Sequence, residues 1–259
     1  VIGEGELDEA PMLYINEKVG SQTGESFDIA VDPLEGTNFT AKNLPNALSV
    51  LAVARSGNLL HAPDIYMEKI AVGANLPKDI VDLDFTVKEN IELLSKSKNI
   101  EPSELTACVL KRPRHDSIVK TLSDMNVKIN FITDGDIAGA ISVADLNTGI
   151  DIYMGIGGAP EGVLSAAALK CLGCQMQTRL VFQNTSEKNR AKKLGIKNLN
   201  KKYKIEDMVK EDVIFCATGV TDGDLVQGIK DLGANFSSET LVLHNSSKTN
   251  KIIKNQTKK

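Results

Sequence analysis

The sequence lacks several features that mark whole classes of protein. No run of apolar residues approaches the ~20 that a membrane-spanning helix needs, and the first residues do not read as a signal peptide. Tryptophan is absent, and histidine occurs three times, at positions without the spacing of metal ligands. We therefore expect a cytoplasmic protein without a membrane segment.

Cysteine is also scarce. Two of the four cysteines, Cys108 and Cys216, lie in apolar runs and are expected in the core. Cys171 and Cys174 form a CxxC motif, but a zinc site would need a second Cys or His pair, and none is nearby. A redox role for this pair is the remaining alternative. This cysteine usage fits a reducing compartment.

An excess of charge of one sign is missing too. The net charge is -4, with a pI of about 5.5, so the sequence lacks the basic footprint of a general nucleic-acid-binding protein. The sequence also contains no GxxxxGK[ST], GxSxG or GxGxxG motif. With 42% hydrophobic and 25% charged residues, the 259-residue chain can form one large domain or two modest ones.

The most informative stretch is Asp32-Pro33-Leu34-Glu35-Gly36-Thr37, which follows the strand-like run 27–31. Proline cannot donate a ladder hydrogen bond, so we expect the strand to end at Pro33. Gly36 allows a ligand to approach the backbone closely. Two carboxylates on a rigid bend suit a hard cation such as Mg²⁺ or Mn²⁺. Taken alone, a strand followed by a polar turn is the simpler interpretation.

The first part of the chain reads as an antiparallel or mixed sheet. Its acidic start, residues 1–9, is either a solvated turn or the source of a metal ligand. A strand over 47–54, a hairpin partner from Leu59, a strand at 70–72 and a helix over 87–96 are predicted. Residues 98–104 are the predicted boundary between domains of residues 1–104 and 105–259.

From residue 105 strands and helices alternate, which is typical of a parallel sheet. Strands are predicted over 105–110, 127–132 and 150–154, and helices over 116–125, capped by Asp116, 137–143 and 163–172. Ligands bind at the carboxyl ends of such strands. These ends carry Arg112 and Arg114, then Asp134 and Asp136, and then a glycine-rich loop with Glu161. For His115, capping or surface exposure is favoured over contact with a phosphate.

Residues beyond 180 are less informative. The lysine-rich segment 184–204 is expected to be a solvated helix and loop. Strands over 212–217 and 240–244 are expected to return to the first domain. Residues 218–224 form either a ligand loop or a capped turn, and we favour the turn. The polar tail from Ser246 is expected to fray.

Several carboxylates with arginines nearby point to metal-assisted phosphoryl chemistry. A hard cation would stabilise charge on a leaving oxygen, and the arginine forks suit a second phosphate. Backbone N–H groups of Gly36 and Thr37 would bind phosphate if a helix begins there. The candidate carboxylates are Glu4, Asp32, Glu35 and Glu161.

Together these motifs resemble a known family. D-P-L-E-G-T is similar to the metal-binding motif of the lithium-sensitive, metal-dependent phosphatases. The stretches V-I-G-E-G-E-L-D-E-A-P-M-L-Y, A-P-D-I-Y-M-E-K, R-P-R-H-D, D-G-D and G-I-G-G-A-P-E-G together resemble the class II fructose-1,6-bisphosphatases of bacteria. The likeness runs from Val1 to about Leu180 and resumes over 213–228 and 239–243.

The resemblance implies hydrolysis of the 1-phosphate of fructose 1,6-bisphosphate by a metal-activated water, with Mg²⁺ or Mn²⁺ as cofactor. It implies that Thr37, Glu4 and Asp32 are catalytic, with Thr37 orienting the water. The implied metal ligands are Glu4, Asp32, Glu35, Glu161 and the carbonyl of Leu34. The implied substrate-binding residues are Glu35, Gly36, Thr37, Tyr66, Arg112, Arg114, Asp134, Asp136, Gly158 and Glu161.

For the fold, the resemblance implies a layered αβαβα sandwich, with a mixed or antiparallel sheet followed by a mostly parallel one. It also implies a homo-oligomer, a dimer or tetramer, that binds a small sugar bisphosphate and neither nucleic acid nor membrane. Alternatives are a phosphatase for sedoheptulose 1,7-bisphosphate or an inositol phosphate, and a non-catalytic fragment that binds metal or sugar phosphate.

The chain departs from the family pattern at three places. It begins at Val1, whereas the family has a preceding segment that contributes residues to the metal site. We therefore expect a fragment, and we leave open whether it binds a second metal ion. Arg112 stands where the family often has lysine, which keeps the charge but changes the hydrogen-bond geometry. Asn16 stands where the family usually has glycine, in a turn that tolerates Asn.

Overall fold

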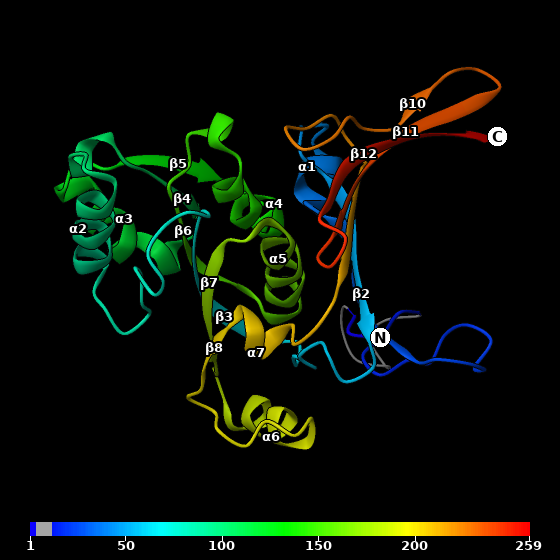
Figure 1. The fold of residues 1–259 in the computed structure, drawn as a ribbon, viewed down its shortest axis with the longest axis horizontal. Coiled ribbons are helices and arrows are strands. Elements are labelled where there is room, and N and C mark those ends of the chain that lie inside the picture. The colour runs from blue at the N-terminus through cyan, green and yellow to red at the C-terminus, as the bar shows by residue number, and fades with distance from the viewer. Residues whose placement is uncertain (4–11) are drawn as a thin grey trace.

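Two sheets and the helices that separate them make up the fold (Figure 1). The structure is a computed structural model that describes residues 1–3 and 12–259. Glu4 and most of the acidic start therefore lie outside the described residues. Asn16 has φ 69°, the left-handed conformation that glycine or Asn accepts, as its place in the sequence predicts.

The layers run in one direction across Figure 1. Helices α2 (Val87–Lys98) and α3 (Asp116–Asp124) cover a mixed sheet, and α4 (Asp136–Ile141), α5 (Ala159–Leu172) and α7 (Ile205–Met208) lie between it and an antiparallel sheet. The α/β class with layered sheets is confirmed. The described residues supply the first four layers of the expected αβαβα order.

The antiparallel sheet has the order β1-β2-β9-β11-β10, with β12 on the other side of β11. Its strands are β1 (Phe27–Glu35), β2 (Leu48–Arg55), β9 (Ile214–Gly219), β10 (Lys230–Asp231), β11 (Asn235–His244) and β12 (Thr249–Lys258). The expected frayed tail is wrong, because β12 pairs with β11 along its whole length. The expected hairpin partner of β2 is also wrong: β2 pairs with β1 and β9, and Leu59 makes an isolated bridge to Val209.

The mixed sheet has the order β5-β4-β6-β3-β7-β8. Its strands are β3 (Tyr66–Val72), β4 (Thr106–Leu110), β5 (Lys128–Ile132), β6 (Ile152–Gly158), β7 (Gln175–Val181) and β8 (Lys202–Lys204). The parallel set is confirmed, since β4 pairs in parallel with both β5 and β6. The expected glycine-rich loop is instead the end of β6, because Gly155 to Gly158 pair with β3.

Strand pairing crosses the predicted boundary near residue 104 in both directions. β3 lies in the sheet of β4 to β8, whereas β9 to β12 return to the sheet of β1 and β2. The expected return of the late strands is therefore present. A division into domains at this boundary stays a prediction.

Helix α5 fills the space between the sheets. Val163, Leu164 and Ala167 are all 0% exposed, and the helix has no polar face along most of its length. A helix that is apolar all round must be buried on every side. A second core lies between the mixed sheet and the outer helices, around Ile91 and Leu122.

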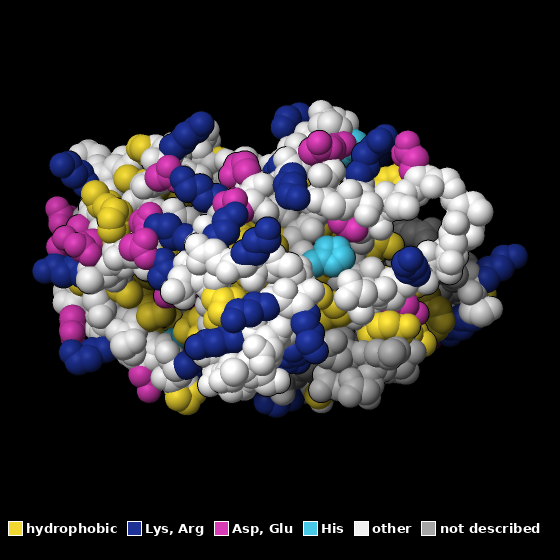
Figure 2. Space-filling view, turned by 90° about the horizontal axis from the view of Figure 1, so that it is seen from below, with side chains coloured by type: hydrophobic (Ala, Val, Ile, Leu, Met, Phe, Trp, Pro, Cys, Tyr) yellow, Lys and Arg dark blue, Asp and Glu magenta, His cyan; other side chains and the backbone are white. Residues whose placement is uncertain are grey.

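The remaining helices are peripheral. α1 (Thr37–Ala41) follows β1, and α6 (Thr185–Lys193) confirms the lysine-rich helix on the outside. Seen from the side of α6, Lys and Arg side chains gather on the surface (Figure 2). Short 3-10 turns occupy Pro102–Glu104, Pro113–His115, Ser142–Ala144 and Leu146–Thr148. His115 rather than Asp116 is the N-cap of α3, without a side-chain cap, so that prediction is wrong.

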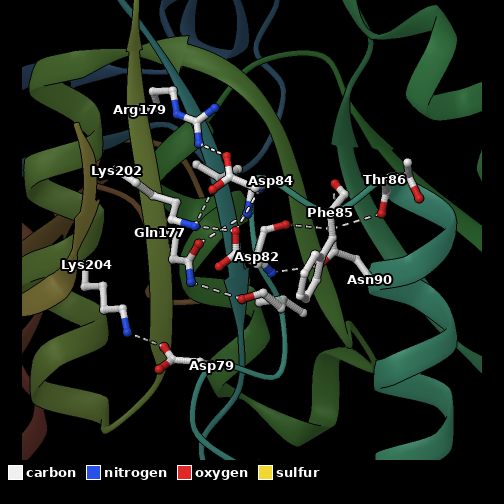
Figure 3. Close-up of polar contacts among 12 residues, drawn as sticks. Asp79, Asp82, Asp84, Phe85, Thr86, Asn90, Gln177, Arg179, Lys202 and Lys204 are labelled. Carbon is white, nitrogen blue, oxygen red and sulfur yellow. Dashed lines mark hydrogen bonds and ion pairs between the residues drawn. The ribbon is translucent and has the colours of Figure 1, made fainter. Parts of the chain in front are cut away.

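The loop before α2 is held against β7 and β8 by ion pairs between its aspartates and the basic residues of these strands (Figure 3). Lys202 bridges Asp82 and Asp84, at 2.7 Å from the latter, and Arg179 also binds Asp84. Lys204 binds Asp79 at 2.6 Å. A cavity of about 470 Å³ opens beside these contacts, away from the predicted site residues.

The search of the described residues for a helix long and apolar enough to cross a membrane found no candidate.

Replacing Leu164 by alanine should lower the free energy of unfolding by ~2–5 kcal/mol, because a buried side chain is lost and a cavity remains. Leu146→Ala is the matched control, since Leu146 is 94% exposed, and should change stability by less than ~0.5 kcal/mol. Equilibrium unfolding in urea measures both. Equal effects would contradict the central position of α5.

Candidate functional site

The predicted site residues meet where the two sheets face each other across the N-termini of α4 and α5. Asp32 and Glu35 end β1, Asp136 begins α4, and Glu161 lies in the first turn of α5. Asp32, Glu35 and Asp136 are 2%, 3% and 4% exposed, and the four carboxylates influence each other electrostatically. The structure thus brings together acids from distant parts of the chain.

β1 continues through Pro33, so the expected strand end there is wrong. The register with β2 shifts between Asp32 and Glu35, as in a β-bulge. β1 is the outermost named strand of its sheet, with Ile2 bridged to its outer edge at Ala30, and a proline is tolerated at such a bulge. Asp32 and Glu35, on either side of this shift, are both buried, and Asp32 Oδ1 accepts a hydrogen bond from the Leu34 N–H at 3.0 Å.

Glu35 caps helix α4 from the opposite sheet. Its Oε1 accepts hydrogen bonds from the N–H groups of Ile137 and Ala138, the latter at 3.3 Å. Gly135, at φ 78°, is the N-cap of α4 and has no side chain to do this. Free N–H groups at a helix start favour a carboxylate. Burial nevertheless raises the pKa of Glu35 well above its usual value, helped by Asp32 and Glu161.

A buried lysine that the sequence reasoning did not single out also faces the site. Lys69 Nζ on β3 donates to Asp136 Oδ2, and the Tyr153 hydroxyl on β6 donates to Asp136 Oδ1. The sequence offers one sign that Lys69 is buried. Met67 and Ala71, two residues before and after it on the same face of the strand, are core residues.

Glu161 is the most accessible of the four carboxylates, with 32% of its side chain exposed. Its Oε2 accepts from the Gly158 N–H at 2.9 Å and lies 3.8 Å from Lys69 Nζ. Burial and then the Asp136 charge raise the pKa of Glu161 to about 7, while Lys69 opposes the rise.

Thr37 begins α1, so a helix starts here, which is the condition under which phosphate binding is predicted, and Thr37 is exposed. Gly36 has φ 78°, and a side chain there would meet the Phe39 ring at 2.6 Å. The Asn38 N–H donates to Asp134 Oδ2 at 3.0 Å. This contact places α1 beside the loop that precedes α4.

Tyr66, Arg112 and Arg114 lie at the same edge of the mixed sheet. Arg114 Nε and Nη2 donate to the Ile156 carbonyl at 3.0 and 2.7 Å, and its guanidinium lies 4.8 Å from the Tyr66 ring centre. Arg112 Nη1 donates to the Thr133 carbonyl at 2.8 Å. Both arginines are therefore anchored at strand ends with further N–H groups left for an anion.

His115 is at the expected capping position, as the N-cap residue of α3 without a side-chain cap bond, but it is fully buried, so a surface position is wrong. Its Nε2 accepts from the Ile156 N–H at 2.8 Å, and its Nδ1 therefore donates to the Leu110 carbonyl at 2.7 Å. Burial lowers the pKa of His115, and the neutral ring ties β4 to β6.

The CxxC cysteines do not show the character of a redox pair. Both are free thiols, and burial raises the pKa of Cys171 and of Cys174 to about 11. A reactive cysteine needs a lowered pKa, so these thiols stay protonated at neutral pH.

Inward-facing carboxylates, anchored arginines and helix N-termini are the groups of a metal-dependent phosphatase. The family model for bacterial fructose-1,6-bisphosphatase, glpX-encoded, matches residues 1–257. The chain therefore belongs to the bacterial class II fructose-1,6-bisphosphatase family, whose members are metal-dependent.

Curated relatives agree with the family model. The chain is 44% identical to the class 2 fructose-1,6-bisphosphatase of Haemophilus influenzae, over 96% of this chain and 78% of the relative. It is 43% identical to fructose-1,6-bisphosphatase 1 class 2 of Escherichia coli, with the same coverage. A Synechococcus relative, 41% identical over 98% of this chain and 80% of its own length, is named a class 2 fructose 1,6-bisphosphatase and sedoheptulose 1,7-bisphosphatase.

The residues present fit a divalent cation. Glu35 Oε2 is buried and has no hydrogen-bond partner among the described residues, which leaves a carboxylate oxygen for a cation. Within residues 1–3 and 12–259, no three acidic, His or Cys side chains already converge as a metal cage. Oxygen ligands of this kind suit hard cations.

The raised pKa of Glu161 predicts how the free energy of unfolding depends on pH when a chelator has removed divalent cations. A carboxyl with a raised pKa stabilises the fold fully below its unfolded value of 4.5, and this contribution is lost as pH rises through about 7. Glu161→Gln should therefore flatten the fall in unfolding free energy over that range, measured in urea with EDTA.

Glu89→Gln is the control for this experiment. Hydrogen bonds from Thr86 lower the pKa of Glu89, so its contribution is lost only at lower pH. The control should keep the parent slope between about pH 4.5 and about pH 7. Parallel curves for the parent and Glu161→Gln would refute the raised pKa.

Proposed function

We propose that the protein containing this chain hydrolyses the 1-phosphate ester of fructose 1,6-bisphosphate to fructose 6-phosphate and inorganic phosphate. The observation that carries the proposal is that Asp32 of β1 and Glu161 of α5 lie near enough to Glu35 to raise its pKa, in a chain that matches the family over residues 1–257. Water attacks the phosphorus, and the bond from phosphorus to the sugar oxygen breaks.

In this proposal Asp32, Glu35 and Glu161 hold Mg²⁺ or Mn²⁺, together with Glu4 and the Leu34 carbonyl. The bound cation supplies stabilisation of the charge that develops on the phosphate and the leaving oxygen. Support comes from Glu35 Oε2, which has no hydrogen-bond partner in the described part of the chain, and from the mutual repulsion of these acids, which a cation would relieve. The exposed hydroxyl of Thr37 orients the attacking water.

The second part of the proposed site binds the substrate. Arg112, Arg114 and Tyr66 hold the distal phosphate, for which the guanidinium forks are suited. Asp134 holds the sugar, Asp136 supports it indirectly, and Gly36, Thr37 and Gly158 contribute backbone contacts. The side chain of Asp136 is already bound by Lys69 and Tyr153, so its contribution to the sugar is through the order it imposes on the loop.

Location and assembly complete the proposal. Four free cysteines fit a reducing compartment, and we place the protein in the cytoplasm. We also propose that it works as a homo-oligomer, a dimer or tetramer, and without nucleic acid or membrane partners.

Glu35→Gln separates the proposed metal role from the structural one. Glutamine keeps an oxygen that accepts from the α4 N–H groups but loses the charge that holds a cation. Phosphate release should fall by roughly 100-fold or more, with the unfolding transition near that of the parent. Glu35→Ala loses the cap as well and should also be destabilised by ~1 kcal/mol. Full activity of Glu35→Gln would remove Glu35 from the metal site.

Arg114→Met tests the distal phosphate. The substitution should raise KM for fructose 1,6-bisphosphate by roughly 10-fold or more, because a charge-assisted hydrogen bond to phosphate is lost. Arg55→Met is the control, since Arg55 pairs with Glu25 on the surface and 68% of its side chain is exposed. Sedoheptulose 1,7-bisphosphate and an inositol phosphate belong in the same assay. Faster release from either would assign the site to that substrate.

A further inference from the structure

Lys69, to which the proposed mechanism gives no part, is the buried centre of a polar cluster. Its side chain is 0% exposed, and it occupies a strand position whose neighbours on the same face pack in the core. An apolar residue would fill such a position with equal or better stability. A buried ammonium therefore calls for an explanation in terms of its partners.

The partners lead directly to the site. We call Lys69, Asp136, Tyr153 and Glu161 the Lys69 cluster. Lys69 Nζ donates to Asp136 Oδ2, Tyr153 donates to the other oxygen of Asp136, and Glu161 Oε2 lies 3.8 Å from Lys69 Nζ. The lysine thus joins the first residue of α4 to the first turn of α5.

Three glycines lie so close to the Lys69 cluster that a side chain at any of them would collide with it or with its neighbours. A Cβ at Gly157 would lie 2.1 Å from Asp136 Oδ2, and one at Gly158 would lie 3.1 Å from Glu161 Oε2. At Gly162 it would meet Met67 Sδ at 2.5 Å and Lys69 Cε at 3.3 Å. The glycines around Glu161 are therefore explained by packing against the cluster, and the arrangement is built into β6 and α5.

We propose that Lys69 is a positioning residue that fixes the Glu161 carboxylate toward the cation. Its ammonium draws Glu161 Oε2 to the same side as the Gly158 N–H, and its bond to Asp136 keeps the ammonium in place. One hydrogen bond, from Gly158, and one ion pair, with Lys69, then define one orientation of Glu161. The inference rests on the proposed function only in taking Glu161 as a ligand of a divalent cation.

The test measures Mn²⁺ binding without substrate, by electron paramagnetic resonance of free Mn²⁺ in the full-length protein. Lys69→Met should weaken binding by roughly 10–100-fold, the range for residues that orient a metal ligand. Lys98→Met is the matched control, because Lys98 makes a partly buried ion pair with Asp151 away from the site. The control should bind Mn²⁺ within about twofold of the parent.

A double-mutant cycle distinguishes positioning from general destabilisation. If Lys69 acts through Glu161, adding Lys69→Met to Glu161→Gln should weaken Mn²⁺ binding no further. Parent-like binding by Lys69→Met, or additive losses in the double variant, would overturn the proposal. If Lys69→Met does not fold, Lys69→Met with Asp136→Asn, which leaves neither charge alone, replaces it under the same two criteria.

The result is separable from the proposed activity. If the parent protein binds Mn²⁺ but releases no phosphate from fructose 1,6-bisphosphate, the proposed function is refuted. The Mn²⁺ affinities of the variants would still decide the role of Lys69. A Lys69→Met protein that binds Mn²⁺ normally would refute the positioning role, whatever the parent hydrolyses.

Discussion

The contact of the Glu35 carboxylate with the start of α4 is the interaction on which the site depends. It joins the bulged end of β1 in one sheet to a helix that packs on the other, across 102 positions of sequence. Without it, two N–H groups at the start of α4 would lose their partner in a buried place, which costs free energy. The same carboxylate keeps a second oxygen that has no hydrogen-bond partner within residues 1–3 and 12–259. One side chain therefore serves both the assembly of the layers and the proposed binding of a cation.

Electrostatic strain is concentrated around this contact. Asp32, Glu35, Asp136 and Glu161 lie near one another, and their burial and repulsion raise the pKa of Glu35 and of Glu161. Lys69 is the compensating charge within the region, and the N-termini of α4 and α5 add their favourable dipoles. A bound divalent cation would relieve the remaining repulsion. Perturbed carboxyl groups of this kind are typical of functional sites, where affinity for a ligand is gained at some expense of stability.

Glycine and helix ends determine how closely these groups approach. β6 runs on through Gly157 and Gly158 beside β3, so Asp136 can lie against the strand itself. Gly36 and Gly135 both adopt positive φ and both face the Phe39 ring. Any larger residue at these positions would push the two halves of the site apart. The backbone therefore contributes to the site as much as the charged side chains do.

The sequence by itself determined the elements with strong local signals. Runs rich in apolar residues located β2 and β9, and the strand-helix alternation after residue 105 placed Arg112, Asp134 and Glu161 at the same edge of a parallel sheet. The motif around Asp32 and Glu35 pointed to a metal-dependent phosphatase because its acids, proline and glycine occur together with the other stretches. These features depend on residues that are close together in the sequence, so they can be predicted from the sequence alone.

Only the tertiary structure decided features that depend on pairing between distant segments. β1 continued past Pro33 because the strand is at the end of its sheet's order and bulges there, and the tail became β12 because β11 offered a partner along its whole length. His115 proved buried because its ring accepts and donates to two strands at once. The residues next to Lys69 in the sequence do not reveal its role. That role depends on Asp136 and Glu161, which begin α4 and α5 and contact Lys69 only in the folded protein. Local periodicity specifies a face of a strand, but the group opposite that face is fixed only when the layers pack.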